Sequence, residues 1–247
     1  MRSLSYPLAP LLVLALACSS KTEAVTPADT GSTDTGVDVA PETTACSSAR
    51  ETTLAPVDTV ATGEVKLLDD TGGVRTIYID AWAGGMSAAP SNPWVYVDLA
   101  KGARVDVNDR QSYVSADWDL AFKRATIHTN SGDAGVGAGG ASYTTKAFDA
   151  VTAADATSTK VETWFDADCK ALVDAIGSIK TTFNGWYDYG GSGSTVTPVA
   201  RTWFVRGGKG DLYKMEIVTY YSGPDGVVRD STSANAARYK IRVAALK

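Results

Sequence analysis

The fold is decided by residues 201–221, which read RTWFVR, GGKG and DLYKMEIVTYY in succession. Aromatic and β-branched residues fill both outer runs, as is typical of strands. Residues 207–210 include three glycines, and glycine adopts the backbone conformations that tight turns require. This stretch therefore predicts an antiparallel β-hairpin.

Further strands are predicted on the N-terminal and C-terminal sides of this hairpin. Short runs rich in Val, Ile, Tyr and Trp, separated by Gly, Asp, Asn and Pro, occupy residues 74–79, 94–99, 119–129, 141–145 and 239–244. One segment has helical spacing, with Asp166 as a candidate N-cap and an apolar face of Phe165, Cys169, Leu172, Val173 and Ile176. The sequence predicts an all-β, antiparallel, sandwich-like domain with about one short helix.

The composition excludes several classes of function. The 247 residues include 23 Lys and Arg against 28 Asp and Glu, a net charge of −5, with no basic stripe, so nucleic-acid binding is not expected. A single histidine, His128, excludes a two-His zinc site and bis-His haem ligation within one chain. Three cysteines exclude a four-Cys metal or iron–sulfur site.

The N-terminal segment has the features of a targeting signal. Arg2 is followed by the apolar run LAPLLVLALA at residues 8–17, which is too short to cross a bilayer as a helix. Small residues before Cys18 resemble a bacterial lipobox, although Leu16 stands two positions before the cysteine instead of three. We predict a lipoprotein signal peptide at residues 1–17 and a lipidated Cys18. The alternative is an ordinary secretory signal that is cleaved nearby.

Residues 18–61 are predicted to form a disordered tether ahead of a β domain at residues 62–247. The tether is rich in Thr, Asp, Ala and Pro, and such a segment cannot bury enough apolar surface to fold. Serines after Cys18 favour outer-membrane sorting, on the periplasmic or the cell-surface face, with shedding as a further route. Cys46 and Cys169 remain as candidates for one disulfide or for two unpaired thiols.

Three motifs resemble catalytic or cofactor-binding signatures but lack the context that those functions require, so an enzyme is not predicted. Asp-Thr-Gly occurs at Asp29 and Asp34, but both copies lie in the tether, whereas aspartic proteases need two rigidly held carboxylates. Residues 135–140, GVGAGG, match G-x-G-x-x-G, but a predicted strand follows instead of a helix, which favours a flexible glycine loop. His128 has no G-x-S-x-G or other nucleophile context.

Several segments together resemble the HmuY-like family of haem-binding bacterial lipoproteins. The most specific is DWDLAFKR at residues 117–124, which continues through TNSG at 129–132 and the glycine loop. Residues 203–207, WFVRG, lead into Tyr213-Lys214-Met215 in the same order as in the family. PWVYVDLAKG at residues 93–102 and Gly185-Trp186-Tyr187 agree with it, and the resemblance covers roughly residues 76–246.

The resemblance implies an all-β, haemophore-type fold that captures haem at the outer membrane and passes it to a receptor. A haem pocket needs apolar and aromatic walls, axial ligands to the iron, and cations or amides for the propionates. Lys123 and Arg124 are candidate pocket cations. Aromatic side chains for the walls are available, although most are expected in the core: Trp82, Trp94, Trp118, Trp164, Trp186 and Trp203.

The expected iron ligands are not in the family positions. Characterised relatives use His or Met pairs, and one family His precedes the Arg of the W-D-x-A-x-x-R run, where this chain has Lys123. In one continuous strand His128 would point to the opposite face from Lys123. Met86, in a predicted loop, is the freest candidate ligand, and His128 is a further candidate for the pocket or for iron ligation. The alternatives are another hydrophobic planar ligand in the same cleft, or a surface interaction lipoprotein that kept the fold and lost haem.

Overall fold

A computed structural model describes residues 45–175, 177–190 and 195–247, all within one unit that spans Val39–Lys247. The predicted signal peptide, Cys18, the tether up to residue 44 and both Asp-Thr-Gly copies lie outside the described residues. Within the described ranges, no helix has the length and apolar character needed to span a bilayer.

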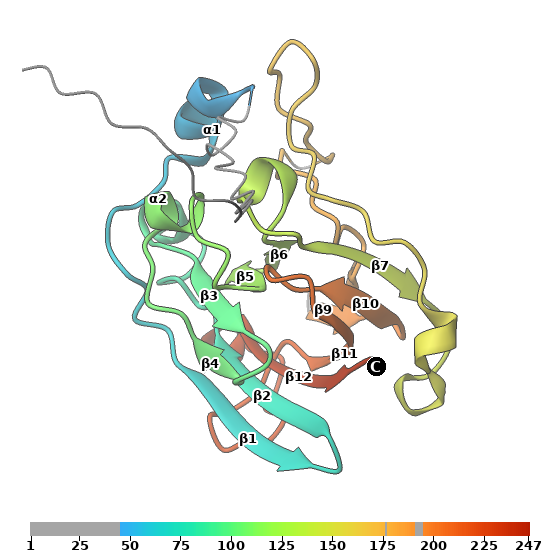
Figure 1. The fold of residues 1–247 in the computed structure, drawn as a ribbon. Helices are drawn as coiled ribbons and strands as arrows, with labels where there is room; N and C mark the ends of the chain where they lie inside the picture. The colour runs from blue at the N-terminus through green and yellow to red at the C-terminus, as the bar shows by residue number, and fades with distance from the viewer. Residues whose placement is uncertain (1–44, 176, 191–194) are drawn as a thin grey trace, which may run out of the picture. The chain divides into compact units, whose positions relative to one another are not determined.

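The larger of the two main sheets is antiparallel and has six strands (Figure 1). Its spatial order is β1 (Val65–Thr71), β2 (Val74–Asp80), β12 (Arg238–Ala245), β11 (Leu212–Thr219), β10 (Thr202–Arg206) and β7 (Gly140–Thr144). The predicted hairpin is confirmed, because β10 pairs with β11 in a register that sets Trp203 opposite Met215. The turn is closed by the bond from the Gly210 amide to the Gly207 carbonyl, 2.9 Å.

A second antiparallel sheet supplies the other main layer of the fold. Its order is β4 (Ala103–Arg104), β3 (Val95–Asp98), β5 (Leu120–Lys123) and β6 (Thr126–Thr129), and a separate pair joins β8 (Tyr187–Gly190) to β9 (Thr195–Pro198). One core cluster unites Ile77, Ile241 and Val243 of the large sheet with Val97, Leu120 and Phe122 of the smaller. The all-β, sandwich-like prediction is therefore confirmed.

The helix predicted around Phe165 is wrong. Residues 165–179 instead form short β-bridges, Phe165 with Ala171 and Val173 with Ile179, while Ile176 lies outside the described residues. The Asp166 carboxylate accepts the amides of Asp168 and Lys170, at 3.0 and 2.9 Å. Such a side-chain turn competes with helical hydrogen bonding, and the apolar spacing reflects alternate bridges instead.

The longest helix of the described chain is α1 (Ser47–Leu54), and a single turn forms α2 (Asp109–Ser112). The α1 helix has no fully buried residue, and only Ala49 and Leu54 pack against a core cluster. It lies within the range that the sequence predicts as tether. Because so few of its residues pack against apolar side chains, the helix has no clear amphipathic pattern in the sequence.

Residues 119–129 form a hairpin, not the single strand that the sequence predicts. Lys123 pairs with Thr126, so Arg124 and Ala125 make a two-residue turn, and Arg124 has a φ of 53°. The Tyr239 hydroxyl holds this turn by donating to the Arg124 carbonyl, 2.6 Å. The turn lacks the Asn or Gly that usually marks such a hairpin, which is why the sequence pattern misses it.

The glycine loop is packed tightly around Asn130 instead of being flexible. The Asn130 side chain donates to the carbonyls of Ser115 and Trp118 and accepts the amide of Gly137, at 2.8, 2.9 and 3.0 Å. A Cβ at Gly135 or Gly139 would lie 2.3 or 2.4 Å from an Asn130 atom, so only glycine fits. The G-x-G-x-x-G pattern therefore serves close packing.

Asp119 joins the same cluster from the start of the hairpin. Its carboxylate accepts the amides of Gly208 and Leu99, at 2.9 and 2.7 Å, and burial raises its pKa to about 6. Because Gly208 lies in the β10–β11 turn and Leu99 follows β3, these bonds tie the two sheets together. We call Asp119, Asn130, the glycines 135, 137 and 139, and Gly208 the Asn130 cluster.

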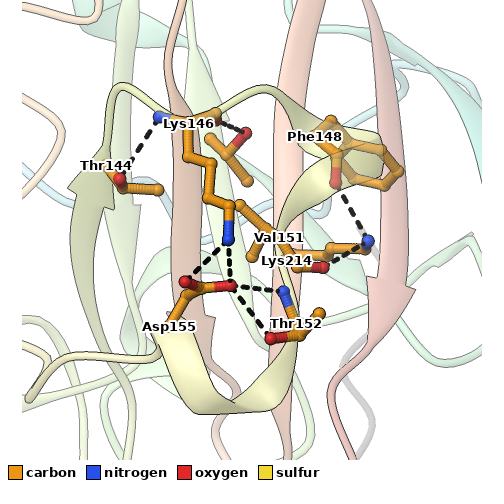
Figure 2. A network of polar contacts seen from close by, with 8 residues as sticks. Thr144, Lys146, Phe148, Val151, Thr152, Asp155 and Lys214 are labelled. Carbon is orange, nitrogen blue, oxygen red and sulfur yellow. Dashed lines mark hydrogen bonds and ion pairs between the residues drawn. The ribbon is translucent and has the colours of Figure 1, made fainter.

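The connection that follows β7 is fixed to the large sheet by polar contacts (Figure 2). Lys146 contacts both carboxylate oxygens of Asp155 at 2.9 Å, and Asp155 accepts from the amide and hydroxyl of Thr152. Lys214 of β11 donates to the carbonyls of Phe148 and Val151, at 2.9 and 2.8 Å. Since Met215 points into the core, Lys214 holds this segment on the opposite face of the sheet.

Candidate functional site

One cavity contains all four residues that the sequence analysis named as candidates for the haem site. Its volume is about 420 Å³, within the range of small-molecule sites. Met86, Lys123, Arg124 and His128 line it together with Trp94 and Trp164. Its remaining lining comes from three places in the chain: the end of α1, the residues Ala89, Pro90 and Thr126, and the segment that contributes Val173, Gly177, Ser178, Ile179 and Thr181. We call it the His128 cavity.

The expectation that Lys123 and His128 point to opposite faces is wrong. The two residues lie on different strands of the β5–β6 hairpin, and Ala121 is paired with His128. Lys123 stands two residues after Ala121, on the same face of β5. The hairpin turn thus brings Lys123 and His128 to one side of the sheet, where both line the cavity.

His128 is held as a neutral ring among aromatic side chains. It is 3% exposed, and its ring centroid lies 4.5 Å from Trp94, 5.0 Å from Trp164 and 5.5 Å from Trp118, each in edge-to-face geometry. Burial lowers its pKa to about 3, so the ring is uncharged at neutral pH. A neutral imidazole retains one nitrogen lone pair for a ligand or an iron ion.

Glu162 positions the Trp164 wall of the cavity. This buried carboxylate accepts from Trp164 Nε1 at 3.2 Å and from the backbone amides of Thr129 and Thr182, at 2.9 and 3.0 Å. The hydroxyls of both threonines also donate to it. Glu162 therefore fixes Trp164 beside the strand that carries His128. Burial raises the pKa of Glu162 above its usual value.

Lys123 places a cation against the aromatic wall. Its Nζ lies 5.3 Å from the Trp94 ring centroid, and burial lowers its pKa. Asp109, whose charge opposes that shift, is occupied elsewhere by the amides of Val57 and Trp94 and the hydroxyl of Tyr96. Burial raises the pKa of Asp109, and hydrogen bonds partly offset that shift.

Arg124 and Met86 complete the set of candidate residues. The Arg124 guanidinium lies 4.5 Å from the Trp82 ring centroid, and its buried Nη1 has no hydrogen-bond partner among the described residues. Met86 is 83% exposed at the edge of the cavity, so its thioether is free to move. Among the described residues, no three His, Cys, Asp or Glu side chains cluster as a metal site.

A disulfide secures the α1 side of the cavity. Cys46 and Cys169 are joined in the structure, with an S–S distance of 2.08 Å. Cys46 immediately precedes α1, whose end contributes Thr53, Leu54 and Ala55 to the cavity. Arg50 also donates to the Asp133 carbonyl, 3.0 Å, and packs over the Tyr113 ring, 3.7 Å.

Sequence reasoning did not single out the cavity walls. Trp94 and Trp164 appear in the sequence only as two of six tryptophans, whereas Trp118 and Trp203 are fully buried in the core, as expected for most of them. The α1 residues lie in the range that the sequence predicts as tether. The one available signal was Cys46, whose pairing with Cys169 brings α1 beside the segment after Trp164.

The family model described as HmuY protein matches residues 91–233, more than half of the chain. The chain therefore belongs to the HmuY family, and the resemblance inferred from the sequence motifs is confirmed. The matched range includes the Asn130 cluster and most of the residues around the His128 cavity, but not Met86 or α1. A comparison with curated proteins finds no match.

The solved structures that match this chain have low sequence identity to it. A Bacteroides vulgatus protein described as HmuY-like and heme-binding is 21% identical over 73% of this chain and 96% of its own, with a TM-score of 0.45. The apo HmuY analog of Tannerella forsythia is 15% identical over 71% and 99%, with a TM-score of 0.42. Apo PinO from Porphyromonas gingivitis is 14% identical over 75% and 97%, with a TM-score of 0.42.

Proposed function

We propose that this protein is a non-catalytic binding lipoprotein that holds haem in the His128 cavity. The observation that carries the proposal is the convergence of Met86, Lys123, Arg124 and His128, from separate segments, on one cavity with tryptophan walls. Membership of the HmuY family supports haem as the ligand. The same arrangement supports binding of another planar apolar ligand if haem does not bind.

The residues present fit a haem group. Trp94 offers apolar ring surface to a porphyrin, Trp164 packs beside His128 in the cavity wall, and the neutral ring of His128 offers nitrogen to the iron. Met86 offers a thioether from an exposed and adaptable position. Bound haem would supply an iron centre able to bind a pair of such side chains. We propose His128 and Met86 as this pair, which is neither of the two pairings known from the family.

Titration of haemin into the purified full-length protein tests this function. A sharp, saturating Soret band with low-spin features in the ferric and ferrous forms is expected. His128→Ala should abolish the low-spin spectrum, and Met86→Ala should convert it to a spectrum with one protein ligand. Met215→Leu is the matched control, because Met215 lies in the core away from the cavity.

A broad band that does not saturate would contradict haem binding. The fold would then serve another ligand or a surface partner. A low-spin spectrum that survives both ligand variants would show that haem binds elsewhere.

We further propose that Cys18 is lipidated and anchors the protein to the outer membrane, where it delivers its ligand to a receptor. The lipobox-like sequence before Cys18 supports the anchor, and Ser19 and Ser20 support the outer membrane. Cys18→Ser should release the protein from the membrane fraction and remove lipid labelling. Membrane association that is unchanged in this variant would disprove the anchor.

A further inference from the structure

The charge of the His128 cavity differs in sign from that of the whole protein. The chain has a net charge of −5, yet the described residues that line the cavity include two cations and no acidic residue. The cations, Lys123 and Arg124, are neighbours at the end of the β5–β6 hairpin. A low-polarity site that concentrates one sign of charge attracts ligands of the opposite sign.

Lys123 has no polar partner within the part of the chain that the structure describes. It makes no hydrogen bond and no ion pair there, and it is half-buried. The other half-buried lysines, Lys214 and Lys240, donate to backbone carbonyls at 2.8–3.0 Å. A partly desolvated ammonium without a partner is costly, so a partner brought by a ligand would stabilise it.

The nearby acid does not satisfy Lys123. Both oxygens of Asp109 accept from other donors, Oδ1 from the Trp94 amide and the Tyr96 hydroxyl and Oδ2 from the Val57 amide. The charge of Asp109 therefore favours the charged form of Lys123 without accepting a hydrogen bond from it. Within the described residues, all three N–H donors of the Lys123 ammonium remain open. Arg124 adds a second cation to the cavity lining, and its guanidinium packs over the Trp82 ring, 4.5 Å from the centroid.

We propose that Lys123, supported by Arg124, binds a carboxylate of the ligand, so that the His128 cavity selects planar apolar ligands that carry carboxylates. This inference rests on the proposed function and assigns Lys123 a role in recognition, not in iron ligation. Charge-assisted bonds of this type are stronger than neutral ones, especially in a partly desolvated site.

Paired titrations with protoporphyrin IX and its dimethyl ester test the proposal. The ring is the same, but the ester has no free carboxylate, and binding is followed by quenching of tryptophan fluorescence in the full-length protein. The free acid should bind about tenfold more tightly than the ester. Lys123→Gln should remove most of that preference by weakening the binding of the free acid much more than that of the ester. Lys123→Arg should retain the preference.

Lys160→Gln is the control, because Lys160 is exposed and does not line the cavity. Equal binding of acid and ester by the wild-type protein would overturn the inference while leaving the proposed function intact. An equal loss of both affinities in Lys123→Gln would also overturn it, since Lys123 would then only shape the cavity. Failure of both metal-free porphyrins to bind would overturn this inference alone, because the proposed function includes iron ligation and is tested separately by the haemin titration.

Discussion

The two ends of the β5–β6 hairpin serve different purposes. At its open end, Asp119 and Asn130 use every polar atom of their side chains within the protein, and the glycine loop packs against them. At its turn, Lys123 has no hydrogen-bond or ion-pair partner among the described residues, and Lys123 and Arg124 both line the His128 cavity. The fold requires the residues at the open end, whereas the residues at the turn are free to change with the ligand.

The largest effect is expected at the open end. Asn130→Ala leaves the Ser115 and Trp118 carbonyls and the Gly137 amide without their partner. Each buried, unsatisfied group costs on the order of 1–3 kcal/mol, so the free energy of unfolding should fall by about 4 kcal/mol. Urea unfolding measures this change. A loss below about 1 kcal/mol would remove the distinction between the two ends.

The disulfide should have the next largest effect, and it should act on the cavity side only. Cys46→Ser with Cys169→Ser is expected to lower the free energy of unfolding by about 3 kcal/mol. Amide hydrogens of α1 should then exchange faster, while those of the Asn130 cluster should not. The bond itself is checked by intact mass, which should rise by two hydrogens on reduction. Unchanged exchange in α1 would mean that its polar contacts suffice.

Acidification should reveal the contribution of His128 to the free energy of unfolding. The His128 pKa is about 3 in the folded protein and about 6.5 when unfolded, so the unfolded chain binds the proton first and stability falls as pH drops. Between pH 7 and pH 5 the wild-type protein should lose about 2 kcal/mol more than His128→Phe.

Asp119 contributes with the opposite sign over this range, since its pKa is raised to about 6 and its neutral form favours the folded state. That contribution is common to both proteins and cancels in the comparison. Parallel stability profiles in urea titrations from pH 7 to pH 5 would refute a neutral, buried His128 ring.

The smallest effect on stability is expected for Met86→Ala. Because Met86 is 83% exposed, its removal should change the free energy of unfolding by less than about 0.5 kcal/mol. The same urea experiment measures it. A large loss would place Met86 among the residues that support the fold, against its assignment to ligand binding.

The strands could be predicted from the sequence wherever side chains alternate between core and solvent. That pattern found β2, β3, β10, β11 and β12, but not β1, whose exposed sequence VKLLDDT has no apolar alternation. The Arg124–Ala125 turn was missed because neither residue is typical of tight turns. The apolar residues around the Asp166 turn have helix-like spacing in the sequence, and this spacing led to the incorrect prediction of a helix.

The candidate site could be predicted in part. The family motif indicated Lys123 and Arg124. His128 and Met86 were candidates because the chain has few residues of the types that ligate iron. Their shared cavity could not be predicted, because it depends on the unrecognised hairpin turn. The role of Trp164 could not be predicted either. Glu162 positions Trp164 and also accepts hydrogen bonds from Thr129 and Thr182, which lie in two distant segments.

The position of β12 has a consequence for how the protein folds. This strand, late in the chain, lies between β2 and β11, and it pairs Ile241 with Ile77 near the start of the domain (Figure 1). The β1–β2 hairpin cannot join β10 and β11 until β12 has been synthesised. Contacts between such distant residues slow folding, so the large sheet should form after synthesis and in a single late step.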